Sequence, residues 1–146
     1  MKRIISFIIF ISVLFSLIIP VFADTEISAK SAILVCADTG DVLYEKNADE
    51  QMNIASITKI MTAIIVMENC ADLNTAVKIK PEWCNIEGSS MYLEAGKSYT
   101  VKELQTGMML ASGNDAATPL ACFVSGSTEK FAKLMNDKAK MLGMDN

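Results

Sequence analysis

The sequence contains no histidine among its 146 residues. This absence excludes Ser-His-Asp triads and Cys-His dyads, and it removes the ligand that nearly every catalytic zinc site uses. A nucleophile in this chain must therefore rely on another base. The chain also lacks a Cys-x-x-Cys pair, because its four cysteines are 34, 14 and 38 residues apart, at Cys36, Cys70, Cys84 and Cys122. That spacing is not typical of a metal site.

Two interpretations of the cysteines stay open. Export of the protein would permit disulfides, and four cysteines allow three full pairings. We favour the alternative, in which each cysteine is a small buried apolar residue. Cys36 follows the apolar residues 33–35, and Cys122 lies in an apolar segment. Neither has a cationic neighbour in sequence that would favour a reactive thiolate, so we expect no cysteine nucleophile.

The chain also lacks any block of charge of one sign. Its 13 basic and 17 acidic residues are mixed, for a net charge of −4. Nucleic-acid binding would need a basic patch, so we expect no nucleic-acid partner. The length allows one domain, and neither an internal repeat nor a low-complexity linker divides it.

The first residues have the pattern of a secretory signal peptide. Lys2 and Arg3 precede an apolar stretch without charge over residues 4–19. Val21 and Ala23 then place small residues at the −3 and −1 positions of a signal-peptidase site. This pattern predicts export.

We therefore expect residues 1–23 to be a signal peptide, with the mature chain beginning at Asp24. Removing the signal leaves eleven basic against 17 acidic residues, a net charge of −6. The alternative is an uncleaved membrane anchor, but the apolar core is shorter than the ~20 residues that a span needs. No cysteine follows that core, which argues against a lipoprotein.

Hydrophobic periodicity predicts an α+β chain after the signal. Thr100 and Glu103 form the pattern of a capping box, and Ser127 is the expected cap of the last helix. The expected elements are a hairpin of residues 31–36 and 42–44, a buried helix over 56–69, an edge strand over 77–80, and helices over 100–111, 115–124 and 127–140.

Three finer expectations concern the last two helices. Pro119 is tolerable in its helix only near the first turn. Glu129 and Lys133 are spaced as a surface ion pair. The buried stripe of the last helix is expected to comprise Phe131, Leu134, Met135 and Leu142.

The apolar run from Ile57 to Met67 indicates a helix buried on all faces, with a single charge, Lys59, one turn after Ser56. Residues three apart share a helix face, so this ammonium and hydroxyl can meet. Burial disfavours the charged form of an amine, which suits a base. The pair is a candidate for a serine nucleophile activated without histidine.

The Ser-x-x-Lys pattern has a structural interpretation too. Ser56 can be the start of a helix that contains a buried lysine. A second copy of the pattern occurs at residues 127–130, where we interpret Ser127 as a helix cap and Lys130 as a surface charge. The pattern alone is therefore weak support for catalysis.

A second motif, Ser112-Gly113-Asn114, lies between two apolar helices, 56 residues after Ser56. It can be a helix-breaking loop with Ser112 or Asn114 as a cap. It can also present a hydroxyl and an amide rigidly to a cleft. Ser-x-x-Lys followed by Ser-x-Asn is the arrangement of the serine penicillin-recognising enzymes, whose third element is Lys-Thr-Gly.

Three segments, residues 55–63, 88–93 and 110–117, resemble the D-alanyl-D-alanine carboxypeptidases, which are the low-molecular-mass penicillin-binding proteins. The closing helix resembles that family too, and the glycine within Ser-Gly-Asn is similar to the carboxypeptidases rather than to class A β-lactamases. Two departures are Ile54, where the family commonly has proline, and Thr118-Pro119, in a helix that is usually rich in alanine.

The resemblance implies a β-lactamase/transpeptidase-like fold of the α+β class, with a helical subdomain and an antiparallel sheet. Residues 24–146 would be the N-terminal part of such a catalytic domain. No Lys-Thr-Gly follows Asn114, so we expect the fold to be truncated before the strand that carries this motif. That strand would supply half of the oxyanion hole and a lysine for the substrate carboxylate.

The resemblance also implies roles for four residues. Ser56 would be the acyl-ester nucleophile and Lys59 its general base. Ser112 would relay a proton to the leaving D-alanine. Asn114 would bind the substrate backbone or orient Lys59. The Ser56 amide would form the other half of the oxyanion hole.

The substrate implied is a peptidoglycan stem peptide ending in D-Ala-D-Ala, with β-lactam antibiotics as covalent inhibitors and no metal or organic cofactor. A C-terminal membrane anchor, common in the family, would lie beyond these residues, and the protein would act at the cell wall or the outer face of the cytoplasmic membrane. Two alternatives are a β-lactamase or β-lactam sensor on the same fold, and a catalytically inactive remnant.

Overall fold

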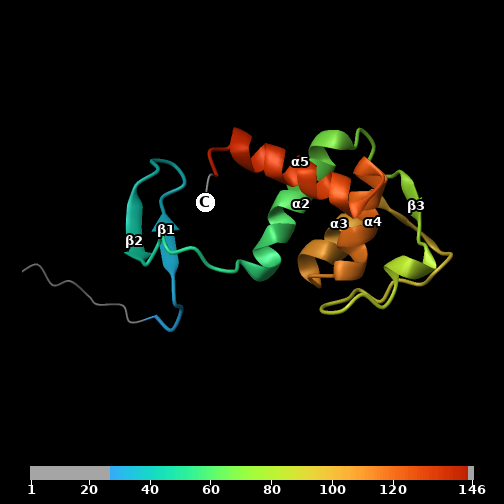
Figure 1. The fold of residues 1–146 in the computed structure, drawn as a ribbon, viewed down its shortest axis with the longest axis horizontal. Helices are drawn as coiled ribbons and strands as arrows, with labels where there is room; N and C mark the ends of the chain where they lie inside the picture. Colours follow the sequence, from blue (N-terminus) through green and yellow to red (C-terminus); the bar gives the residue numbers. More distant parts are fainter. Residues whose placement is uncertain (1–26, 145–146) are drawn as a thin grey trace, which may run out of the picture. The chain divides into compact units, whose positions relative to one another are not determined.

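The computed structural model describes residues 27–144 (Figure 1). The described residues fall into two compact units, 27–50 and 51–144. The predicted signal peptide, residues 1–23, lies outside the described residues. Between residues 27 and 144, no helix has the length and apolar character needed to cross a bilayer.

The first unit contains the predicted hairpin. Strands β1 (Ala32–Val35) and β2 (Val42–Lys46) pair in antiparallel fashion, with an irregularity in register at the end of β1. In the turn, Gly40 has a φ of +79°, a value that glycine adopts without steric strain because it has no Cβ atom. The hydroxyl of Thr39 donates to the carboxylate of Asp41 over 2.7 Å. The hairpin prediction is confirmed.

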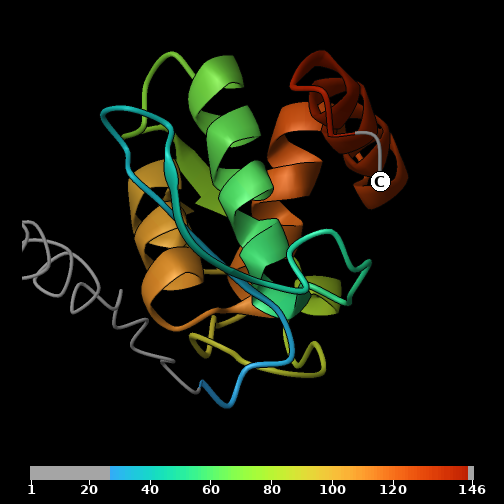
Figure 2. The ribbon, with the colours of Figure 1, turned by 90° about the vertical axis from the view of Figure 1, so that its left-hand side faces the viewer.

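The second unit is mainly helical. Helix α2 contacts the three helices that follow it, and α3 packs against α4 (Figures 1 and 2). A two-stranded antiparallel ribbon and two 3-10 turns complete the unit. Its elements are η1 (Ala55–Ile57), α2 (Thr58–Asn69), β3 (Ala76–Lys78), η2 (Pro81–Trp83), β4 (Ser98–Thr100), α3 (Val101–Leu110), α4 (Asn114–Ser125) and α5 (Thr128–Met141).

The core of this unit lies where α2, α3 and α4 meet. Burial of such large aliphatic side chains contributes about 1.5–3 kcal/mol each, and it fixes the three helices against one another. Among the most deeply buried apolar side chains are Val66, Ile79, Val101, Leu104, Met108 and Leu120.

Capping interactions define the ends of three helices. Thr100 accepts from the backbone N–H of Glu103, whose carboxylate accepts in return from the Thr100 N–H, so the predicted capping box is confirmed. Ser127 caps α5 by accepting from the Lys130 N–H over 3.2 Å, also as predicted. Gly126, with a φ of +84°, ends α4.

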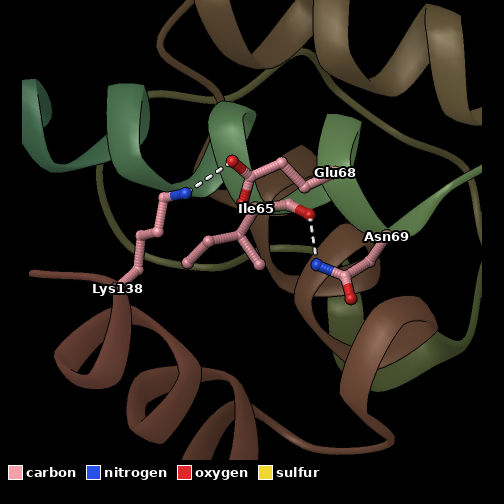
Figure 3. A network of polar contacts seen from close by, with 4 residues as sticks. All are labelled: Ile65, Glu68, Asn69 and Lys138. Atoms are coloured by element: carbon pink, nitrogen blue, oxygen red, sulfur yellow. Dashed lines mark hydrogen bonds and ion pairs between the residues drawn. The ribbon is translucent and has the colours of Figure 1, made fainter. Parts of the chain in front are cut away.

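Polar contacts fix α5 to the end of α2. Lys138 Nζ of α5 lies 2.5 Å from Glu68 Oε1 of α2, and the Asn69 side chain donates to the Ile65 carbonyl over 2.8 Å (Figure 3). Phe131 anchors the other end of α5 in the core, with 3% of its surface exposed. The Lys138–Glu68 ion pair and the buried Phe131 hold α5 along α2, whereas the Asn69–Ile65 bond lies within α2.

Helix α2 is not buried on all faces, contrary to the sequence prediction. Lys59, Thr62 and Val66 are buried on one side, whereas Ile57 and Ile60 belong to an exposed apolar stripe. The core of the described unit covers only one face of the helix. Its exposed apolar side chains are Ile57, Ile60, Ile64 and Met67.

The predicted stripe of α5 is also only partly correct. Phe131 is buried and Met135 packs against the core, but Leu134 and Leu142 are exposed. The predicted ion pair of Glu129 with Lys133 does not form, and the Glu129 carboxylate instead accepts from the Thr128 hydroxyl over 3.2 Å. The Glu129 carboxylate thus interacts with a group at the start of α5 rather than with Lys133.

Three smaller differences concern β4, the end of the predicted strand over 77–80 and Pro119. Strand β4 was not expected, and it pairs with β3 so that Val77 faces Tyr99. The observed β3 ends at Lys78, two residues earlier than predicted. Pro119 is buried and lies at the sixth position of α4, one residue further from the helix start than in the predicted helix and beyond its first turn. It offers no N–H to the carbonyl of Asp115, but the helix continues.

All four cysteines are free and half-buried. Cys70, Cys84 and Cys122 pack against the edge of the core, in agreement with the apolar interpretation. Cys36 does not pack against the core, so the interpretation is wrong for this residue, and hydrogen bonds with Thr39 lower the pKa of its thiol. Burial raises the pKa of the Cys122 thiol, which disfavours the thiolate at neutral pH.

Candidate active site

Ser56 lies in the 3-10 turn η1, directly before α2. The preceding Ala55 has a φ of +46°, a strained value for a residue with a Cβ atom. One turn later, Lys59 is buried, with 9% of its surface exposed, and its Nζ donates to Ser56 Oγ over 3.2 Å. The Ser56 N–H is in the first turn of this helical segment, where backbone donors have no intrahelical acceptor.

Ser112 meets the same pair from the other side. It lies between α3 and α4 with a φ of +54°. Its hydroxyl donates to Ser56 Oγ over 2.6 Å, and Lys59 Nζ donates to Ser112 Oγ over 3.1 Å. Two hydroxyls and one amine thus form a closed triangle of hydrogen bonds.

This triangle is competent for proton transfer. All three edges, from 2.6 to 3.2 Å, are within the distance at which a side chain can exchange a proton with a reacting group. Ser56 Oγ can therefore lose its proton to Lys59, directly or through Ser112. The exposure of Ser56 leaves its oxygen accessible to a substrate.

A cavity of about 490 Å³ adjoins the triangle. Ser56, Lys59 and Asn114 line it on the polar side, and Phe131 and Met135 of α5 line it on the apolar side. A carbonyl group at Ser56 Oγ would lie beside this cavity, because Ser56 is one of its lining residues.

Asn114 is the fourth predicted site residue. Its Nδ2 donates to the carbonyl of Glu87 over 2.7 Å, and its backbone N–H donates to the carbonyl of Ser89 over 2.7 Å. Lys59 bonds to the two serines and makes no bond with Asn114 in the described chain. Of the two predicted roles of Asn114, its position in the cavity wall is compatible with substrate binding.

The sequence interpretation assigned no role to Asp115. Its carboxylate is buried at the start of α4, where it accepts hydrogen bonds from residues 90, 91 and 93. Burial would by itself raise the pKa of this carboxyl, but the hydrogen bonds from Leu93, Met91 and Ser90 hold the pKa below its usual value. The signal in the sequence was one acidic residue opening an otherwise apolar helix.

Within residues 27–144, no group of three or more His, Cys, Asp or Glu side chains is placed to hold a metal ion. The reactive side chains that the structure brings together at this site are those of Ser56, Lys59 and Ser112. The catalytic roles of these residues are predictions that we take up below.

Comparison with known proteins gives a family match for the chain. The family model described as D-alanyl-D-alanine carboxypeptidase matches residues 20–146. The chain is 46% identical over 122 residues to the D-alanyl-D-alanine carboxypeptidase DacF of Bacillus subtilis, covering 81% of this chain and 31% of that protein. It is 42% identical over 131 residues to DacC of Escherichia coli, covering 83% of this chain and 33% of that protein.

Solved structures agree with the sequence comparison. The D-alanyl-D-alanine carboxypeptidase DacD of Francisella tularensis matches with a TM-score of 0.79 and 40% identity, over 85% of this chain and 31% of that one. A Streptomyces K15 DD-transpeptidase matches with a TM-score of 0.77 and 36% identity, over 81% of this chain and 50% of that one. The predicted α+β, transpeptidase-like fold is confirmed for the portion that this chain covers. The chain spans about a third of the length of the two curated relatives.

Proposed function

This chain belongs to the D-alanyl-D-alanine carboxypeptidase family, and on that premise we propose that it carries the nucleophile, the base and the proton relay of a serine-type D-Ala-D-Ala carboxypeptidase. The substrate is a peptidoglycan stem peptide, from which the terminal D-alanine is removed. The observation that carries this proposal is the hydrogen-bonded triangle of Ser56, Lys59 and Ser112.

In the acylation step, Ser56 Oγ attacks the carbonyl carbon between the two D-alanines while its proton passes to Lys59 Nζ. The carbon–nitrogen bond then breaks, and the nitrogen of the leaving D-alanine takes a proton. Ser112 supplies that proton and recovers one from Lys59, because its Oγ lies 2.6 Å from Ser56 Oγ and 3.1 Å from Nζ. Water then hydrolyses the ester on Ser56.

Charge develops on the carbonyl oxygen during both steps. The Ser56 N–H, at the start of a helical segment, supplies one donor to that oxygen. Asn114 lines the adjoining cavity and binds the substrate backbone there. β-Lactams, whose strained amide mimics the scissile bond, acylate Ser56 in the same way.

The proposed place of action is the cell wall or the outer face of the cytoplasmic membrane. The charged and apolar pattern of residues 1–23 and the small residues at its end support export. There the enzyme would trim stem peptides during synthesis and remodelling of the wall, which determines cell shape.

The proposal is tested by labelling the purified protein with fluorescent penicillin and locating the adduct by peptide mass spectrometry. We expect one covalent adduct, on Ser56, which Ser56→Ala abolishes. Ser127→Ala is the matched control, because Ser127 belongs to the second Ser-x-x-Lys pattern and caps α5. Labelling that survives Ser56→Ala, or an adduct on Ser127, would contradict the assignment.

A second assay separates the carboxypeptidase from a β-lactamase. The protein is incubated with a synthetic stem peptide ending in D-Ala-D-Ala, and free D-alanine is measured. Release of D-alanine that depends on Ser56 supports the proposal. Rapid turnover of penicillin without any release of D-alanine would favour the β-lactamase instead.

A further inference from the structure

Asp115 is a buried charge to which the proposed reaction gives no role. Only 1% of its surface is exposed. Oδ1 accepts from the Met91 N–H over 2.9 Å, and Oδ2 accepts from Ser90 Oγ over 2.7 Å and from the Leu93 N–H over 3.0 Å. None of the ion pairs within residues 27–144 includes it. A buried carboxylate without a counter-ion is tolerated because it is fully hydrogen-bonded.

The same loop, residues 87–93, also accepts hydrogen bonds from the start of α4. The carbonyl of Ser89 accepts from the Asn114 N–H, and the carbonyl of Glu87 accepts from Asn114 Nδ2, both over 2.7 Å. Five hydrogen bonds thus join the loop to two consecutive residues, Asn114 and Asp115. The loop and the first turn of α4 form one polar unit.

Close packing adds to these bonds on both sides of Ser112. A Cβ atom on Gly113 would lie 2.8 Å from Asp115 Oδ1 and 3.2 Å from the Met91 nitrogen. A Cβ atom on Gly107, in α3, would collide with Met91 Sδ. Met91 therefore lies against both helices that flank Ser112, with its amide on α4 and its side chain on α3.

Ser112 needs such support. Its φ of +54° is a sparsely populated region for a residue with a Cβ atom, and such strain persists only where the surroundings determine it. On its N-terminal side, the Ala111 N–H donates to the Gly107 carbonyl and fixes the end of α3. On its C-terminal side, the loop fixes Gly113 and Asn114. The position of Ser112 Oγ beside Ser56 follows from both constraints.

We propose that Asp115 is a positioning residue, whose carboxylate holds the loop of residues 87–93 against α4 and thereby sets Ser112 and Asn114 beside Ser56. Its importance for catalysis rests on the proposed function, but the geometry that it imposes does not. Asp115 touches no reacting atom and acts through the loop.

A simpler role for Asp115 would be that of an acidic residue at a helix N-terminus, where it interacts with the helix dipole. The chain offers a matched control for this alternative. Asp115 is the second residue of α4, and Glu129 is the second residue of α5. Glu129→Gln removes an equivalent charge from an exposed helix start that has no loop to hold.

The first experiment uses amide hydrogen exchange, followed by NMR or mass spectrometry, on the protein with Asp115→Asn. This change keeps the size of the side chain, but its NH2 group is a donor where the carboxylate had an acceptor. It faces the Leu93 N–H and the Ser90 hydroxyl if it replaces Oδ2, and the Met91 N–H if it replaces Oδ1. We expect the protection of the Asn114 amide to fall by about tenfold, while that of the Phe131 amide in α5 changes by less than about twofold. Equal loss at both amides would mean a general loss of stability and would overturn the proposal.

The second experiment measures acylation by fluorescent penicillin at a temperature where every variant is folded. We expect Asp115→Asn to lower the acylation rate constant at saturating probe by about tenfold or more, with a smaller change in the probe concentration at half-saturation. Glu129→Gln should leave both values within about twofold of the parent. Equal effects of the two changes would show that only the helix dipole is involved.

Ser90→Ala keeps the proposal testable if Asp115→Asn does not fold. It removes one of the three hydrogen bonds to the carboxylate. We expect a smaller loss of protection at the Asn114 amide than in Asp115→Asn, again with little change at the Phe131 amide. Unchanged protection of the Asn114 amide in this variant would contradict the proposal. If the parent protein itself fails to react with penicillin, the proposed function fails, and the exchange experiment still decides the role of Asp115.

Discussion

Ser112 Oγ lies 2.6 Å from Ser56 Oγ, although the two serines are 56 positions apart in the chain. They meet because α3 and α4 both pack on α2, and because the chain turns between α3 and α4 at Ser112. The hydroxyl beside the nucleophile is thus placed by the packing of three helices. Substitutions of Ser112 should therefore affect catalysis without affecting the fold.

Replacing Ser112 should remove the proton relay and leave the fold intact. We expect Ser112→Ala to lower the rate of acylation by fluorescent penicillin by about 10²–10³-fold, a typical loss for general acid–base catalysis. Ser112→Gly is the control for strain, because glycine tolerates the φ of +54°. The Ser112→Gly protein should therefore unfold at a higher temperature than the Ser112→Ala protein. Normal acylation in either variant would rule out the relay.

Lys59→Arg tests whether the lysine acts as a base. A guanidinium stays protonated in proteins, so it can donate to the two serines but cannot accept the Ser56 proton. We expect acylation to fall by about 10²-fold or more, and circular dichroism should show the helical content unchanged. Lys130→Arg, at the other Ser-x-x-Lys pattern, should have no effect. Near-normal acylation by Lys59→Arg would show that only the positive charge is needed.

Gly88 and Gly96 provide a matched pair for the loop that borders the site. Both have positive φ angles, +99° and +83°, so alanine is strained at either position. A Cβ atom on Gly88 would lie 2.6 Å from Asn114 Nδ2, whereas one on Gly96 meets nothing within 4 Å. In urea unfolding we expect Gly96→Ala to cost about 1 kcal/mol and Gly88→Ala about 2–3 kcal/mol. An equal loss of free energy of unfolding in the two variants would mean that the Asn114 side chain can move away from the added Cβ atom.

The depressed pKa of the Asp115 carboxyl predicts a dependence of stability on acid. Because its pKa is lower in the folded than in the unfolded protein, its contribution is complete above the ordinary aspartate value of about 3.9 and is lost as the pH falls through the folded value. The free energy of unfolding should therefore drop more steeply below about pH 4 in the parent than in Asp115→Asn. Urea unfolding at a series of pH values measures this difference. If the free energy of unfolding fell with the same slope below about pH 4 in the parent and in Asp115→Asn, the lowered pKa of Asp115 would be contradicted.

A control for this titration is the exposed Glu103. Hydrogen bonds from the Thr100 backbone and hydroxyl hold its pKa below the usual value, so it also contributes to acid sensitivity. Glu103→Gln should remove that part of the dependence without changing the part that belongs to Asp115, because the two carboxylates have no hydrogen-bond partner in common.

Local features of this protein were determined by its sequence. Ser56 and Lys59 meet because residues three apart share a helix face, and the Thr100–Glu103 capping box and the hairpin turn at Gly40 follow from side chains that bond to nearby backbone. These interactions span at most a few residues, so the pattern of residues is sufficient to predict them.

Tertiary structure decided the rest. Periodicity could not tell which face of α2 would be covered, and Ile57 and Ile60 are exposed because the described helices pack on the other side. The meeting of Ser112 with Ser56 and the burial of Asp115 under the loop of residues 87–93 depend on contacts 22 to 56 residues apart in the chain. Such contacts are set by how whole helices pack, and no local pattern encodes them.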